Sequence, residues 1–317
     1  MHVLFVIDPL DTLNLATETS LLLVEELARR GHRVSVATLG DLYLGDQEAG
    51  VRARTIRLDL ARQPFYALGP ATESRFTDFD LVLMRKDPPV DADYINATFV
   101  LERAAAVVPV INDPVSLRTV NEKLLPLSVP RFVPPTLVSS DAHRLAGFAA
   151  VHGRVVLKPL DDCSGRGIEV LQAPDAGRIA AYVAAHGGRY VMMQQFIAGV
   201  VRGDKRIFLL AGDAIGAVNR VPRSGEHLAN IHQGARVEAT ELTARDQAIV
   251  AAVKPLLVAR GLWLAGIDVI DGYLTEINVT SPSAARQINA VSAAHIERTI
   301  VDRLEQHGAR GPAPLHA

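Results

Sequence analysis

The first third of the chain alternates short apolar runs with amphipathic stretches. Apolar runs at residues 3–8, 33–39, 79–86 and 107–112 are typical of buried strands. Between and after them, apolar residues recur at helical spacing over residues 17–30, 93–106 and 114–125, which predicts three helices. Strands that alternate with helices in this way predict a parallel sheet covered on both faces, and so an N-terminal α/β domain.

The pattern changes after the proline-rich segment 126–135, "PLSVPRFVPP". Beyond this segment, strand-like runs cover residues 154–160, 168–172, 189–197, 205–212 and 213–222, and two more fill 263–278. Helices are predicted at 175–186, 243–260 and 292–306. Several strands follow one another directly, so this part is predicted to be α+β with mostly antiparallel pairing.

Composition narrows the class of protein. A length of 317 residues fits two or three domains, and 49% hydrophobic with 21% charged residues is typical of a globular protein. The net charge of −2 argues against nucleic acid or an anionic membrane as the main partner, and no apolar stretch is long enough to span a bilayer. Cys163 is the only cysteine, which excludes an intrachain disulfide and favours the reducing cytoplasm.

Two common nucleotide-binding motifs are missing. The first strand-to-helix turn, "DPLDTLN", has no glycine, so the dinucleotide fingerprint is absent where that fold would need it. No Gly-Lys dipeptide occurs, which excludes the usual P-loop. A dehydrogenase built on the N-terminal region is therefore disfavoured.

Polar side chains interrupt the two apolar strands at 263–278. Glu276 and Asn278 are two residues apart on one strand and share a face. A strict two-residue loop at Asp271-Gly272 would put Asp268 and Glu276 on opposite faces, whereas a longer connection or a bulge would place them opposite each other. Both arrangements remain open from the sequence.

The oxygen atoms of Asp268, Glu276 and Asn278 are the donors that hard cations prefer. Mg²⁺ commonly completes its coordination with phosphate oxygens, which points to a nucleotide. The alternative is an edge-strand carboxylate pair solvated by water, with Asn278 starting a turn. This stretch alone does not decide between the two.

Cationic residues at the ends of predicted elements favour the nucleotide. Lys158 ends an apolar strand, where an ammonium group is costly unless its charge is used or reaches solvent. Gly165 and Gly167 in the next loop offer backbone amides that could fold over an anion. Four more cations stand at similar places: Lys123, Lys205, Arg206 and Arg220. A polar pair followed by two apolar residues predicts an adenine slot, formed by Gln194, Gln195, Phe196 and Ile197.

Seven segments together resemble one family. "GDLYL", "LMRKDPP", "NEKL", "LKPLD", "GDKR", "GIDVI" and "LTEINVTSP" are similar, in order and spacing, to segments of the bacterial glutathione synthetase family of ATP-grasp enzymes. The resemblance runs from residue 1 to about 306. It implies an N-terminal α/β domain (1–122), an ATP-grasp region (123–308) with a small lid (about 130–193) and a central antiparallel-sheet domain (about 194–308), and a flexible tail (309–317).

The resemblance also implies a reaction. In this family the carboxylate of γ-glutamylcysteine takes the γ-phosphoryl group of ATP, and the amine of glycine then attacks the acyl phosphate to give glutathione, ADP and phosphate. The implied cofactors are ATP and Mg²⁺ (or Mn²⁺), and the implied assembly is a homo-oligomer, a homotetramer by the family's habit.

Residue roles follow from the matched segments. The resemblance implies metal ligands at Asp268, Glu276 and Asn278, and catalytic guanidinium groups at Arg206 and Arg220. It implies nucleotide contacts at the lysines, glycines and adenine-slot residues named above, and anchors for the substrate at Arg85, Asn230 and Arg286.

Some positions depart from the family pattern. Asp162 and Ser164 stand where the family carries glycine, and Arg286 is followed by Gln287 where the family tends to have glutamate. These departures lie near the lid and the substrate, so a related ligase with another donor or acceptor is the first alternative. The second is a regulator that binds ATP without forming an acyl phosphate.

Overall fold

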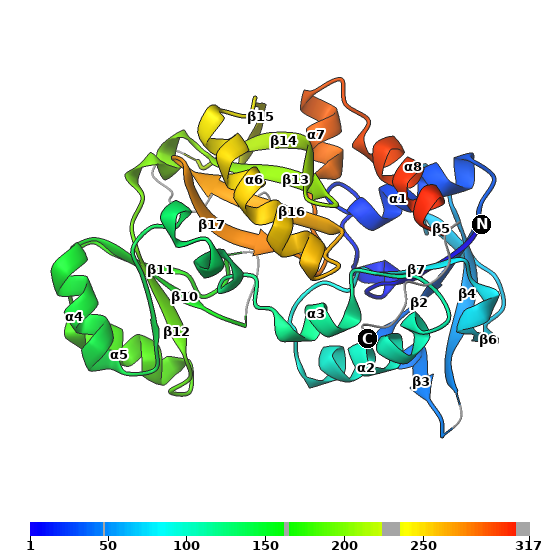
Figure 1. The fold of residues 1–317 in the computed structure, drawn as a ribbon, viewed down its shortest axis with the longest axis horizontal. Coiled ribbons are helices and arrows are strands. Elements are labelled where there is room, and N and C mark those ends of the chain that lie inside the picture. Colours follow the sequence, from blue (N-terminus) through cyan, green and yellow to red (C-terminus); the bar gives the residue numbers. More distant parts are fainter. Residues whose placement is uncertain (47, 162–164, 224–234, 309–317) are drawn as a thin grey trace.

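The computed structural model describes residues 1–46, 48–161, 165–223 and 235–308, and these form three sheets in chain order (Figure 1). In the first sheet, strands β1 (His2–Val6), β2 (Arg33–Ala37), β7 (Leu81–Met84) and β8 (Val110–Ile111) pair in parallel in the order β2-β1-β7-β8. Helix α1 (Thr19–Arg29) connects β1 to β2, helix α2 (Ala92–Ala105) connects β7 to β8, and helix α3 (Pro114–Thr119) follows β8. The predicted parallel sheet is confirmed.

The sheet also has an antiparallel extension that the apolar pattern did not predict. Strand β4 (Ala49–Leu58) pairs with β2 and carries β3 (Leu42–Leu44), β5 (Tyr66–Leu68) and β6 (Thr72–Arg75). These strands are short or half exposed, so they lack the continuous apolar runs of the central strands.

Helix α3 is shorter than predicted. It ends at Thr119, whereas the periodicity predicted a helix as far as residue 125. The side-chain oxygen of Asn121 accepts hydrogen bonds from the backbone amides of Lys123 and Leu124, at 3.0 and 3.2 Å. Such local bonds compete with the helical ladder, so Glu122 and Lys123 stand in a turn.

The second sheet is antiparallel and carries its helices on one face. It contains β9 (Thr136–Ser139), β10 (Val155–Pro159), β11 (Glu169–Leu171) and β12 (Val191–Gln195) in the order β11-β10-β12-β9, covered by α4 (Ala142–His152) and α5 (Ala176–Ala185). Val155 and Leu157 pack under these helices. Because side chains alternate along a strand, Val156 and Lys158 point to the opposite face.

The third sheet is also antiparallel. It contains β13 (Asp204–Leu210), β14 (Asp213–Val221), β15 (Arg236–Ala239), β16 (Leu264–Ile270) and β17 (Tyr273–Asn278), in the order β15-β14-β13-β16-β17. Helix α6 (Ala244–Ala259) packs its buried residues against one face through Ile207 and Ile267. The antiparallel α+β character expected beyond residue 135 is confirmed.

The C-terminal segment returns to the first sheet. One helix was predicted at 292–306, but the structure has α7 (Ala285–Val291) and α8 (Ile296–Gly308). Helix α8 lies against α1, where Arg30 pairs with Asp302 and Glu305 (Figure 1). The predicted domain limits at 122, 130, 193 and 308 stay predictions.

Short 3₁₀ turns complete the fold. They are η1 (Leu10–Thr12), η2 (Leu39–Asp41), η3 (Phe76–Asp78), η4 (Leu125–Ser128), η5 (Pro130–Phe132) and η6 (Ala198–Arg202). The proline-rich segment 126–135 forms η4 and η5, consistent with its interruption of the regular pattern. Within the described ranges, every helix is too short or too polar to cross a bilayer.

Candidate active site

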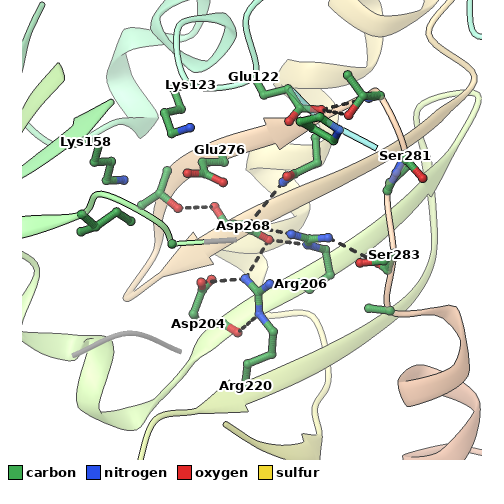
Figure 2. Close-up of a pocket in the computed structure, with 18 of the residues that line it drawn as sticks. Glu122, Lys123, Lys158, Asp204, Arg206, Arg220, Asp268, Glu276, Ser281 and Ser283 are labelled. Carbon is green, nitrogen blue, oxygen red and sulfur yellow. Dashed lines mark hydrogen bonds and ion pairs between the residues drawn. The ribbon is translucent and has the colours of Figure 1, made fainter. Parts of the chain in front are cut away.

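A cavity of about 500 Å³ lies between the second and third sheets, and the first sheet closes one end. Its wall includes Lys158 and Gln194 from the second sheet, and Arg206 and Glu276 from the third. Figure 2 shows the charged groups of this wall converging on one region. The cavity therefore joins residues that lie up to 279 positions apart in the sequence, from Asp8 to Gln287.

The β16–β17 hairpin places two carboxylates opposite each other. Its two-residue turn pairs Ile270 with Tyr273, but the register shifts after Val269, so that Asp268 pairs with Glu276. Thr275 is the extra residue, which makes a β-bulge. The bulge that the sequence left open as one alternative is thus confirmed.

The residues on the cavity face of the third sheet follow from strand alternation. Asp204 and Arg206 are two apart on β13, and Asp204 stands opposite Arg220 of β14. Arg206 stands opposite Asp268. Gly266 pairs with Asn278, and a Cβ at Gly266 would lie 3.0 Å from Cδ of Arg206, so glycine leaves the arginine room to cross the strand.

Asp268 is held by two arginines. Nε and Nη2 of Arg206 donate to its two oxygens at 2.5 and 2.9 Å, and Nη2 of Arg220 lies 2.9 Å from Oδ1. Asp268 is 4% exposed, and burial acts to raise its pKa. The charges of Arg206 and Arg220 outweigh burial, so the pKa of Asp268 is held well below its ordinary range.

Asp204 is a second carboxyl on this face that the sequence analysis missed, and its side chain is 17% exposed. Arg220 donates to its Oδ2 at 2.6 Å, while Oδ1 is buried without a hydrogen-bond partner among the described atoms. Burial raises the pKa of Asp204 to about 6, with Arg220 opposing and the charge of Asp268 adding to the rise. Its place directly before Lys205 and Arg206 in "GDKR" was an available signal.

The donor atoms near Glu276 fit a hard cation. Glu276 and Asn278 present carboxylate and amide groups to the cavity. Asn278 donates from Nδ2 to Asp268 and to the backbone oxygen of Gly266, both at 3.3 Å. Asp268 lines the cavity with both oxygens engaged by guanidinium groups, and the described residues contain no group of three His, Cys, Asp or Glu arranged for a metal.

Two lysines face this carboxylate region from the other side (Figure 2). Lys123 is 7% exposed and Lys158 is 8% exposed. Burial lowers the pKa of Lys158, Glu276 opposes that shift, and Lys123 adds to it. Two buried ammonium groups this close to each other form a site suited to an anion with several negative charges.

An apolar slot borders the lysines. It is lined by Val156, Val170, Phe196, Ile197, Val200 and Ile270. The guanidinium carbon of Arg154 lies 3.5 Å from the centre of the Phe196 ring and supports it. Gln194, which is buried, donates to the Thr136 hydroxyl at 3.0 Å, and Gln195 and Gly165 also line the cavity. The apolar walls of this slot suit a flat heterocycle.

Some predicted site residues do not line the cavity. Lys205 lies on the other face of β13, where its ammonium donates to Asp246 at 2.6 Å. Arg286 pairs with Glu25 of α1 at 2.7 Å, and Gly167 packs against Pro159 and His186. Their neighbours Arg206, Gln287 and Gly165 line the wall in their place.

Arg85 is buried behind the cavity wall. It donates to the Ser20 hydroxyl at 3.1 Å and to the backbone oxygen of Pro282 at 2.9 Å. Burial lowers its pKa. Pro282 lines the cavity, so Arg85 supports the wall from behind. Asn230 lies outside the described residues.

Several acidic residues of the wall were not predicted. Asp8 and Asp87 follow β1 and β7, which are neighbouring parallel strands, and Glu18 and Glu122 come from the segments beside α1 and α3. Burial raises the pKa of Asp87, and Glu18 adds to the rise. The carboxyl ends of adjacent parallel strands are a usual place for ligand contacts, so Asp8 and Asp87 could have been proposed from the sequence.

Comparison with known proteins places this chain among ligases. The family model for the prokaryotic glutathione synthetase N-terminal domain matches residues 1–118, and the model for the ATP-grasp domain of the same enzymes matches residues 122–293. A glutathione synthetase of Gloeobacter violaceus is 42% identical over 315 residues, covering 97% of each chain. One of Salmonella typhimurium is 36% identical over 309 residues, covering 96% of this chain and 98% of that protein.

Solved structures share the fold at low sequence identity. D-cycloserine synthetase DcsG superposes with a TM-score of 0.67 at 19% identity, covering 95% of this chain and 99% of that chain. An ATP-grasp ligase of Chryseobacterium gregarium, in complex with ADP and a leader and core peptide, has a TM-score of 0.66 at 16% identity and covers 97% of both chains. The expected ATP-grasp fold is confirmed.

Proposed function

This chain belongs to the prokaryotic glutathione synthetase family, and from that premise we propose that it joins γ-glutamylcysteine to glycine through an acyl phosphate. The class of the protein, an ATP-dependent ligase, follows from family membership. The choice of γ-glutamylcysteine and glycine, and the residue roles below, are the proposal.

The observation that carries the proposal is that cationic groups from two sheets gather around one cavity that also holds Glu276. Lys158 on the second sheet faces Glu276 on the third, with Arg206 and Arg220 on the same face of the third sheet. Phosphoryl transfer depends mainly on positioning and on neutralising charge, and this wall offers both.

Each group has a role in the proposed reaction. Lys123 and Lys158 bind the phosphates of ATP, and the apolar slot with Phe196 and Ile197 takes the adenine. Glu276 and Asn278 would hold Mg²⁺, which supplies charge neutralisation at the phosphates when bound. Both residues line the cavity, and Asp268 orients the two arginines.

The arginines act on the transferring group. A carboxylate oxygen of the donor attacks the γ-phosphorus and ADP leaves, which gives the acyl phosphate. The amine nitrogen of glycine then attacks the acyl carbon, phosphate leaves with the bonding electron pair, and the amine releases a proton. Arg206 and Arg220 stabilise the negative charge that develops in both steps.

A related ligase with another donor or acceptor remains the second candidate. Gln287 lines the cavity, where the family tends to carry glutamate, and Asp162 and Ser164 stand in the glycine loop. A change of charge at the wall is a direct way to change the substrate that fits there.

A matrix of dipeptides against amines tests the proposal. We expect γ-glutamylcysteine with glycine to give the tripeptide by mass and to release one ADP for each product. The unrelated pairs serve as controls. Turnover with another pair and none with γ-glutamylcysteine plus glycine would replace the first candidate with the second.

A further inference from the structure

Glu122 contacts the outer edge of the strand that carries Glu276 and Asn278. Strand β17 is the last strand of its sheet, so its outward backbone donors need partners from elsewhere. The backbone amide of Ile277 donates to the backbone oxygen of Glu122 at 3.0 Å. Oε1 of Glu122 accepts from the amide of Val279 at 2.6 Å, from the amide of Thr280 at 2.9 Å and from the Thr280 hydroxyl at 2.9 Å.

The two residues that flank Glu122 point to other parts of the cavity. Asn121 donates from Nδ2 to the backbone oxygen of Leu160 at 2.8 Å, directly after the strand with Lys158. Lys123 follows Glu122 and lines the cavity (Figure 2). Three consecutive residues therefore link the second sheet, the edge of the third sheet and a cationic side chain.

We propose that Glu122 is a positioning residue that fixes Asn278 relative to Lys123 across the nucleotide cavity. The inference rests on the proposed function, because it assumes that both groups serve Mg²⁺ and ATP. Val279 directly follows Asn278, and the two amides after Asn278 have Glu122 as their acceptor. Buried amides without an acceptor are unfavourable, so this turn would shift without Glu122 and take Asn278 with it.

The geometry indicates that reach matters here and negative charge does not. All three donors converge on one oxygen, which the amide oxygen of glutamine could replace. Burial raises the pKa of Glu122, and the charge of Glu276 adds to the rise, so the negative charge is itself unfavourable at this place. Aspartate keeps the charge but is shorter by one methylene, and its oxygen would not reach the turn.

Equilibrium binding of the magnesium complex of a non-hydrolysable ATP analogue tests the inference in the full chain. By calorimetry we expect Glu122→Asp to raise the dissociation constant about tenfold, because the shorter side chain loses the hydrogen bonds to the turn, and Glu122→Gln to stay within about threefold of wild type. Thr280→Val removes only the hydroxyl donor, so its dissociation constant should lie between those of the wild type and Glu122→Asp. Glu26→Asp is the control, since Glu26 is a buried acid on α1 bonded to Arg29 and Arg30.

The outcomes separate the two proposals. Binding to Glu122→Asp as tight as to wild type, or to Glu122→Gln as weak as to Glu122→Asp, would overturn the positioning role. Weaker binding to Glu26→Asp, matching the loss in Glu122→Asp, would also overturn it, because the effect would then be a general loss of stability. Failure of the wild-type protein to bind the analogue would instead contradict the proposed function.

Discussion

At the scale of single residues, the cavity depends on buried charges that balance one another. Asp204 and Asp268 stand against Arg206 and Arg220, and each carboxylate contacts at least one guanidinium. Arg206, Arg220 and Asp268 are buried, so removal of one partner leaves a buried charge uncompensated, at a cost of about 3–5 kcal/mol. Glu276 differs, because it faces the lysines across open cavity.

Glu276→Gln tests the metal role. We expect kcat to fall about 100-fold or more, because the amide removes the charge that would hold Mg²⁺ at the phosphates. ADP release measured across a Mg²⁺ titration checks this, with unchanged thermal unfolding as evidence of an intact fold. Glu238→Gln, at the exposed strand β15, is the matched control. Wild-type turnover in Glu276→Gln would remove Glu276 from the proposed mechanism.

Asp204→Asn tests the pH dependence of stability. The folded protein keeps the Asp204 proton up to a pKa of about 6, whereas the ordinary pKa of an aspartate in an unfolded chain is 3.8. Between these values the unfolded chain has released a proton that the folded chain retains, so the free energy of unfolding falls as pH rises from about 4 to about 6. Because the pKa of Asp268 is depressed, this residue changes the free energy of unfolding only at pH values below this window.

Urea unfolding followed at Trp263, the single tryptophan, measures this slope. Between about pH 4 and about pH 6, we expect Asp204 to lower the free energy of unfolding of the wild-type protein by about 2–3 kcal/mol. The free energy of unfolding of Asp204→Asn should fall correspondingly less. The comparison uses the slope with pH, because the substitution also weakens the contact with Arg220. Equal slopes for the two proteins would show that the pKa of Asp204 is not raised.

At the scale of elements, the β16–β17 hairpin decides which side chains meet. Its turn residues Asp271 and Gly272 have φ values of 51° and 77°, as a two-residue hairpin of this type requires. The bulge at Thr275 then shifts the register by one residue, which brings Asp268 and Glu276 to the same face. Without the bulge, every side chain of β17 beyond it would point the other way.

Gly272→Ala tests the turn. We expect a loss of about 1–2 kcal/mol in the free energy of unfolding, because an alanine pays a steric cost at this φ and its Cβ would lie 3.0 Å from Cγ of Arg245. Gly147→Ala is the matched control. Gly147 is in helix α4 with open space around it, so alanine there should stabilise by about 0.5–1 kcal/mol. Destabilisation of similar size at both sites would contradict this account.

At the scale of the whole molecule, the cavity belongs to no single sheet. Its wall takes Lys158 from β10, Arg206 from β13 and Asp8 from the end of β1. Helix α8 lies against α1, which joins the last part of the chain to the first sheet (Figure 1). The homotetramer and the cytoplasmic location stay predictions, and native mass spectrometry would test the first against the 34.1 kDa of one chain.

Hydrogen exchange tests the shared wall. We expect Mg²⁺ with a non-hydrolysable ATP analogue to slow amide exchange in β10 and β17 together, because both strands line the cavity and a bound ligand suppresses their local opening. Strand β5, on the far extension of the first sheet, is the internal control. Protection confined to one of the two sheets would place the nucleotide elsewhere.

Local patterns in the sequence were sufficient for much of the architecture. Alternation of apolar and polar residues predicted the parallel strands and the antiparallel second half, because side-chain direction along a strand depends only on neighbouring residues. The motif segments then indicated the family, which the comparisons confirm. Short half-exposed strands such as β3 and β6 carry too weak a pattern to be recognised in this way.

Pairing between distant segments was decided only by the tertiary structure. The bulge at Thr275, the contact of Glu122 with the edge of β17 and the ion pair of Asp204 with Arg220 all depend on which strands meet. Lys205 and Arg206 look equivalent in the sequence, yet only Arg206 faces the cavity. The reason is physical: the sequence determines the alternation of faces along each strand, whereas the face that meets the ligand is set by how the sheets pack.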